Sequence, residues 1–431
     1  MKKIYAFLAV AILALGLVIF FVIRGNSDGG SNNGDNGPDN GPVGKTIELT
    51  YSGTASDKEF NQGLFEAFKA DRKAKGDPNT YIINYFECGP DAIDSTVLDW
   101  AAPNAPDVYE AASDKINILY GKGALAKVTG TYKSFIETEM TEFAQELVKL
   151  NGEIYAYPYT GDNTYYLQYD ASVFTAEEVA SMETLLAAAA SKNYKVGYNL
   201  ETAYWGGAAM FTFGADYEMS YDEDGNLIDI VCDFDSVKGL KAAKAIYSIM
   251  NHEAWVNESG VPAEGSATKA VIGGTWDIHG FKGVWGENYA CATMPTVTVD
   301  GETATLGCFL GGKFFGVNPQ VSQGDTDRFV AANELAKFLS GYECQTKRYE
   351  EFDTFPCIVS AQSHKNMEGD QNVAVLKAQY GYARPQSAVP STFWNAPTAL
   401  IAGIKDGTIT ADGLQAACDN FNAAIKSELN N

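Results

Sequence analysis

The residues that could perform covalent chemistry are few, and they form no recognisable catalytic arrangement. The three histidines, His252, His279 and His364, are far apart and lack the spacing of metal ligands. The chain contains no GxxxxGK(S/T), HExxH or GxSxG motif, and its seven cysteines show no CxxC spacing. We therefore expect no catalytic residues, no metal site and no cofactor, and no disulfide framework can be read from the cysteines.

Carboxylates are the one abundant reactive group. The chain has 55 aspartates and glutamates, so some pair of carboxylates will lie close together by chance. Glycoside hydrolysis needs only two suitably placed carboxylates. A sugar-active enzyme such as a glycoside hydrolase therefore remains an alternative, although we expect a protein that is not an enzyme.

Length and charge limit the kind of protein and the kind of partner. A chain of 431 residues is too long for one ordinary hydrophobic core, so we expect two lobes or domains. The net charge of -24 argues against nucleic acid or an anionic membrane surface as a partner. This balance suits a soluble protein in an extracytoplasmic space.

The first 45 residues predict an attachment to the membrane. Lys2 and Lys3 precede an unbroken apolar run, Ile4 to Ile23, which is long enough to cross a bilayer as a helix. The run ends in bulky residues rather than a small-residue cleavage site, so residues 1–24 are predicted to be a membrane anchor, with a cleaved signal segment as the alternative. Residues 25–45 are rich in Gly, Asn, Asp and Ser and are predicted to be a flexible linker. The body would then lie at the extracellular face of the cell membrane, or be secreted if the segment is cleaved.

The body reads as strands that alternate with helices. A strand at 46–52 is followed by a helix beginning near Asp57, and a buried strand at 81–86 precedes another strand that begins at 105–109. This order predicts a parallel sheet in an α/β fold. The acidic residues 222–225 are predicted to form a hairpin turn rather than a calcium site, because their glycine is in the wrong position for a calcium loop.

The stretch from Asn151 to Asp170 has two interpretations. An Asn-Gly turn opens it, a strand follows at 154–157, Pro158 is expected to end that strand, and a second strand is predicted at 165–169. The two strands would be either a hairpin or one segment that crosses between lobes. Because the strand–helix pattern restarts after Asp170, we favour a crossing near 159–164, with further crossings at 310–315 and 358–363.

Several short motifs occur in the order found in one known family. The chain resembles the extracellular solute-binding proteins of ABC sugar importers, specifically the maltose/maltodextrin-binding group, from Thr46 to Glu428. The motifs that carry the resemblance are Asp57-Lys58, Pro106-Asp107-Val108, residues 151–158, Asn199-Leu200 with Tyr204, Gly274-Thr275-Trp276, Met294-Pro295 and Phe393-Trp394.

The resemblance implies a two-lobed, periplasmic-binding-protein-like (Venus flytrap) α/β fold with a doubly wound sheet in each lobe. Lobe 1 would comprise residues 46–160 and 314–360, and lobe 2 residues 161–313 and 361–431. It also implies capture of an oligosaccharide, maltodextrin being favoured over another oligosaccharide, and delivery to the permease subunits of an ABC transporter by a monomer. A membrane-tethered glycan-binding adhesin or sensor is a further alternative.

The resemblance also identifies candidate substrate-binding residues. Acidic and basic side chains would hydrogen-bond sugar hydroxyls, and aromatic rings would stack on the apolar faces of sugar rings. Each has a plainer interpretation, as a helix cap, a solvated turn residue or a core residue. The candidates are Asp57, Lys58, Asp114, Lys115, Asp162, Tyr204, Trp276 and Trp394.

Two departures from the family pattern affect specificity. Where the family has a tryptophan before the second acidic pair, this chain has Ala111 or Glu110, and Thr398 replaces a basic residue in the late helix. We therefore expect some stacking to be lost, or to be supplied elsewhere by a residue such as Trp100 or Tyr166.

Overall fold

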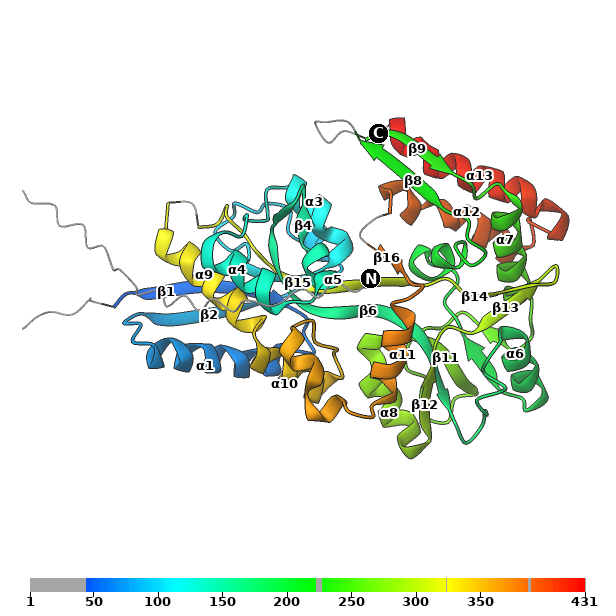
Figure 1. Ribbon diagram of the computed structural model, residues 1–431, viewed down its shortest axis with the longest axis horizontal. Coiled ribbons are helices and arrows are strands. Elements are labelled where there is room, and N and C mark those ends of the chain that lie inside the picture. Colours follow the sequence, from blue (N-terminus) through cyan, green and yellow to red (C-terminus); the bar gives the residue numbers. More distant parts are fainter. Residues whose placement is uncertain (1–43, 222–226, 323, 387–388, 431) are drawn as a thin grey trace, which may run out of the picture. The chain divides into compact units, whose positions relative to one another are not determined.

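The computed structural model describes residues 44–221, 227–322, 324–386 and 389–430, and the body begins at Gly44 (Figure 1). The predicted membrane segment, nearly all of the linker and the turn at 222–225 lie outside the described residues. None of the helices in the described part of the chain is long and apolar enough to cross a membrane.

The first half of the body builds a parallel sheet. Strand β1 (Thr46–Gly53) pairs in parallel with β2 (Thr80–Glu87) and with β3 (Val108–Ala112). Helix α1 (Lys58–Ala74) joins β1 to β2 and buries Leu64, Phe65 and Phe68. The alternation of strands and helices therefore gives the parallel α/β arrangement predicted from the sequence.

The stretch around Asn151 contains one long strand rather than two. Asn151 and Gly152, both with positive φ, form the predicted turn between β4 (Lys149–Leu150) and β5 (Glu153–Ile154). Strand β6 then runs without a break from Ala156 to Asp170 and is buried along its whole length. The hairpin alternative is therefore wrong.

Pro158 does not end the strand, contrary to the sequence prediction. It pairs with Phe314 of β15 (Phe309–Val317) beside a shift in the register of the ladder. Among the described residues, β15 is the only ladder partner of this first part of β6, because β11 (Thr268–Gly274) and β12 (Tyr289–Ala292) pair with residues 165–170. A proline without an amide hydrogen is tolerated at such an edge or irregularity.

Strands β6 and β15 join two hydrophobic cores. One core gathers residues between Ile47 and Tyr159 and between Phe314 and Ala361. The other gathers residues between Tyr165 and Phe309 and between Phe393 and Ile425. The chain passes from one core to the other within β6 and returns within β15, so both strands belong to both cores.

Within the described residues, ten strands form one mixed sheet. Its order is β10-β7-β11-β6-β15-β3-β1-β2, with β12 added beside β6 and β16 beside β15. Figure 1 shows α1 beside β1 and β2, and α13 beside β8 and β9. The remaining strands are β7 (Lys195–Gly197), β8 (Tyr217–Tyr221), β9 (Leu227–Cys232), β10 (Trp255–Val256), β13 (Thr296–Val299), β14 (Glu302–Thr305) and β16 (Arg384–Pro385).

The helices that cover the two cores have these bounds: α2 (Ile93–Thr96), α3 (Ile116–Gly121), α4 (Gly130–Glu139), α5 (Glu142–Glu146), α6 (Met182–Ser191), α7 (Val237–Met250), α8 (Ile278–Trp285), α9 (Thr326–Leu339), α10 (Tyr342–Phe352), α11 (Gln371–Gln379), α12 (Ala396–Asp406) and α13 (Leu414–Lys426).

Candidate ligand-binding site

Three short helical turns gather around the crossing strands. They are η1 (Ser113–Lys115) directly after β3, the π-helical turn η2 (Ala203–Gly207), and η3 (Thr275–Asp277) directly after β11. Turns η1 and η3 begin where a strand ends, which is where α/β sheets place ligand sites.

Hydrogen bonds fix each turn to the crossing. The Gly312 amide donates to the Ser113 hydroxyl at 3.2 Å, which ties η1 to β15. The Thr275 hydroxyl donates to the Thr164 carbonyl at 3.3 Å, and the Tyr204 hydroxyl donates to the Asn163 carbonyl at 3.3 Å. These contacts position the side chains of all three turns relative to β6 and β15.

Tyr204 and Trp276 lie together in an aromatic group. The Trp276 ring centroid is 6.2 Å from that of Tyr204 and 6.2 Å from that of Trp205. Trp276 is 44% exposed, whereas Trp205 is buried at 5%. Trp276 therefore offers an aromatic surface to solvent, and Trp205 supports it from the core.

The glycine before this turn is required by the tryptophan. A Cβ atom on Gly274 would lie 2.2 Å from the Trp276 ring, far inside van der Waals contact. The Gly-Gly-Thr-Trp sequence thus lets the indole lie against its own backbone at the end of β11.

Trp394 joins the aromatic group through Phe309. It closes the turn η8 (Ser391–Trp394), and its ring centroid is 5.5 Å from that of Phe309. Phe309 also stacks on Tyr204 at 5.8 Å. Trp394 is partly buried against the second core, so it contributes both to packing and to the aromatic surface.

Asp114 and Lys115 approach the same place from the first core. The Lys115 ammonium lies 3.6 Å from the Asp114 carboxylate and 3.8 Å from that of Asp94, both longer than a hydrogen bond. The buried Oδ1 atom of Asp114 has no hydrogen-bond partner among the described residues. Burial raises the pKa of Asp114, and the charge of Lys115 opposes that rise.

The electrostatics of Tyr204 connect the two sides of the site. Burial, followed by the negative charge of Asp114, raises the pKa of Tyr204 well above its usual value. Asp114 and Tyr204 are thus within electrostatic range of each other, although they belong to different cores.

The Asp162 side chain forms hydrogen bonds within the crossing. The Phe355 amide donates to one of its carboxylate oxygens at 2.5 Å, and the Thr160 hydroxyl donates to the other. The side chain is only 5% exposed, and burial raises its pKa against these hydrogen bonds. Both oxygens therefore already have partners that hold β6 in place.

Asp57 and Lys58 lie at the start of α1. Asp57 accepts a hydrogen bond from Ser56 at 2.8 Å, and Lys58 forms an ion pair with Glu87 at 2.7 Å. In the described residues neither forms a hydrogen bond, ion pair or ring contact with the aromatic group. Tyr204, Trp276 and Trp394 thus lie in one aromatic group, and the Asp162 carbonyl accepts a hydrogen bond from Thr275, beside Trp276. Asp114 is linked to this group by its charge at Tyr204, and Lys115 by its contact with Asp114, whereas Asp57 and Lys58 remain outside it.

Sequence reasoning missed Lys313, which lies on β15 with its ammonium 5.9 Å from the Trp276 ring centroid. The available signal was a single charge in the apolar strand FLGGKFFGV. Phe309 was missed for a different reason, because an aromatic residue in a buried strand usually indicates only core packing.

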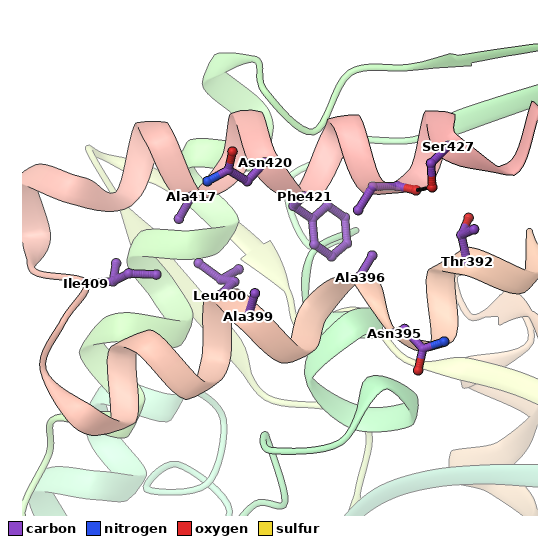
Figure 2. A pocket seen from close by; sticks show the side chains of 11 residues that line it. Thr392, Asn395, Ala396, Ala399, Leu400, Ile409, Ala417, Asn420, Phe421 and Ser427 are labelled. Atoms are coloured by element: carbon purple, nitrogen blue, oxygen red, sulfur yellow. Dashed lines mark hydrogen bonds between the residues drawn. The ribbon is translucent and has the colours of Figure 1, made fainter. Parts of the chain in front are cut away.

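Two cavities elsewhere do not involve the predicted residues. One, of about 280 Å³, lies between α12 and α13, and Figure 2 shows Phe421 and Leu400 among its lining residues. Another, of about 430 Å³, is lined by Phe211, Asp216 and Arg384 among others. Tyr204, Trp276 and Trp394 are absent from the lining of both cavities. In the described part of the chain, no group of three His, Cys, Asp or Glu residues could hold a metal ion.

Comparisons with known proteins agree with this architecture. Residues 63–375 match the family model described as bacterial extracellular solute-binding protein. The maltodextrin-binding protein MdxE of Bacillus subtilis (strain 168) is 24% identical over 388 residues, covering 82% of this chain and 85% of that protein.

Solved structures show the same fold. One determined with acarbose has a TM-score of 0.76 and 24% identity, and covers 89% of this chain and 100% of its own. The maltodextrin-binding protein MalE1 of L. casei BL23 has a TM-score of 0.71 and 21% identity, and the match covers 88% of this chain and 99% of that one. The chain belongs to the bacterial extracellular solute-binding protein family and has its two-lobed α/β fold. The family places it outside the cytoplasm.

Proposed function

We propose that the protein is the substrate-binding component of an ABC transporter and that it captures an oligosaccharide between its two lobes. The observation that carries this proposal is the exposed Trp276 ring, backed by Tyr204 and Trp205, with the negative charge of Asp114 acting on Tyr204. A sugar ring has an apolar face that stacks on an aromatic ring and a rim of hydroxyls that bind carboxylates and ammonium groups. The names of the relatives favour maltodextrin.

Capture would proceed by hinge closure. The proposed lobe 1 comprises residues 46–160 and 314–360, and lobe 2 residues 161–313 and 361–431. The two hydrophobic cores support this division, because the chain changes core within β6 and β15. A ligand that touches both lobes binds the closed form better and therefore shifts the population toward it. Permease subunits would then recognise the closed monomer.

Calorimetric titration of residues 44–431 with maltose, maltotriose and maltotetraose tests this function. We expect saturable heat with at least one of them. Absence of heat with all three at millimolar concentration would contradict the maltodextrin assignment, and a wider glycan screen would then test the oligosaccharide class.

We further propose that the protein releases its ligand unchanged. We also propose that residues 1–24 tether it to the membrane. Long incubation with maltotetraose should leave the glycan length unchanged, whereas shorter products would indicate a glycoside hydrolase. Fractionation of cells that express the full chain should recover it with the membrane, and recovery in the medium would indicate cleavage.

A further inference from the structure

Lys313 lies on β15 in the crossing, between β3 and β6. Within β15 it pairs with Ala112 of β3 on one side and with Thr160 of β6 on the other. It is the one charged residue of a strand that is otherwise buried, and its own side chain is only partly exposed. Its ammonium group therefore emerges where the chain passes from one core to the other.

This ammonium group has no conventional partner. In the part of the chain that the structure describes, Lys313 forms no ion pair and no side-chain hydrogen bond. The ammonium nitrogen lies over the face of the Trp276 ring, 5.9 Å from the ring centroid. An ammonium group carries three donors, and a partly buried donor without an acceptor is costly.

Two carboxylates, those of Asp162 and Asp277, interact electrostatically with the Lys313 ammonium group without accepting a hydrogen bond from it. The positive charge of Lys313 opposes the rise that burial causes in the pKa values of Asp162 and Asp277. Neither carboxylate lies within ion-pair distance, and both oxygens of Asp162 already accept hydrogen bonds from Thr160 and Phe355. The negative charges of these two carboxylates thus stabilise the Lys313 ammonium group, and its three N–H donors remain available to a ligand.

We propose that Lys313 is a ligand-binding residue, which donates a charge-assisted hydrogen bond from the crossing strand to an oxygen of the sugar stacked on Trp276. The proposal rests on the proposed oligosaccharide function and adds to it a donor carried by β15. Because β15 pairs with strands on both sides, this contact would fix the ligand relative to both cores.

The test compares Lys313→Met with Lys377→Met, which changes an exposed lysine on α11. Maltotriose affinity is measured by calorimetry, and the melting temperature without sugar is measured by circular dichroism. We expect Lys313→Met to weaken binding by about tenfold or more, since it removes a charged hydrogen bond. Lys377→Met should bind as the wild type does, and Lys313→Arg should recover part of the loss.

The possible outcomes separate the two proposals. If the wild type binds maltotriose and Lys313→Met binds equally well, the role of Lys313 is overturned while the sugar function stands. A fall in melting temperature with unchanged affinity would also overturn it, because Lys313 would then serve only as a counter-charge for Asp162 and Asp277. If Lys313→Met does not fold, Lys313→Gln provides the same comparison. If the wild type gives no heat with maltotriose, the maltodextrin assignment fails, and the two variants are compared with the glycan that the wider screen identifies. If no glycan in that screen binds the wild type, the sugar function fails and the role of Lys313 fails with it.

Discussion

At the scale of residues, exposure separates side chains that face a ligand from side chains that support it. Trp276 and Trp205 are neighbours in one aromatic group, yet only Trp276 presents its ring to solvent. Trp276 was a candidate because the Gly274-Thr275-Trp276 motif resembles the solute-binding family. The environment of Asp162 was not predictable, because its partner Phe355 is 193 residues away in the chain.

Trp276→Ala should weaken maltooligosaccharide binding by roughly tenfold or more, because the stacking surface is lost. The fold should persist, since the ring is 44% exposed. Trp205→Ala, the matched change, should instead destabilise the protein by about 3–5 kcal/mol by leaving a cavity. Trp394→Ala should show both effects. Calorimetry and urea unfolding measure them, and unchanged affinity in Trp276→Ala and Trp394→Ala would show that neither ring binds the ligand.

Asp114 should make binding depend on pH. Its carboxylate accepts sugar hydroxyls fully only when ionised, and burial raises its pKa above the ordinary value of 3.8. Affinity should therefore be highest at neutral pH and fall as the pH drops through that raised value. Titrations between pH 7.5 and the acid limit of folding measure this.

Asp114→Asn provides the control for that pH series. It should bind more weakly than the wild type at neutral pH, and its affinity should change less with pH. An equally steep decline in the variant would assign the effect to another carboxylate, such as Asp277, whose pKa burial also raises.

At the scale of elements, the alternation of strands and helices predicted the parallel sheet correctly, and the Asn-Gly signal predicted the turn at Asn151. The continuity of β6 was missed at Pro158. Local propensity indicated a break there, but pairing with β15, more than a hundred residues later, carries the strand through. Such long-range pairing leaves no local signal.

Close backbone packing at the crossing should make Gly312 intolerant of a side chain. An added Cβ would lie 2.3 Å from the Thr160 carbonyl oxygen and 2.4 Å from a Leu147 methyl group. We expect Gly312→Ala to cost about 1–3 kcal/mol in the free energy of unfolding.

Gly283→Ala on α8 is the matched control for Gly312→Ala. A Cβ there meets nothing within 4 Å, so the change should be neutral or stabilise the helix by about 0.5–1 kcal/mol. Urea unfolding measures both variants, and equal effects would show that packing at the crossing is not responsible.

At the scale of the whole molecule, stability should not depend on disulfides. All seven cysteines are unpaired, and only Cys291 is more than marginally exposed. Burial raises the pKa of Cys291 to about 12 and that of Cys344 to about 11, so little thiolate exists at neutral pH. Reductant should leave the melting temperature unchanged.

Thiol counting provides the second measurement. A chromogenic disulfide reagent should react slowly with the native protein at neutral pH and should find all seven thiols in urea. Fewer than seven in urea without reductant would contradict the unpaired state.

Because both cores share β6 and β15, neither core can fold until residues made late in synthesis are present. The first core lacks a strand until Phe314 to Val317 has been made, and the second lacks α12 and α13 until the last residues. The first core cannot close before Ala361 has been made and the second cannot close before Ile425, and such non-local pairing slows folding. A chain that must pass through a membrane before it folds would thereby keep its second core open, and that part of it transportable, until the last helix has been synthesised.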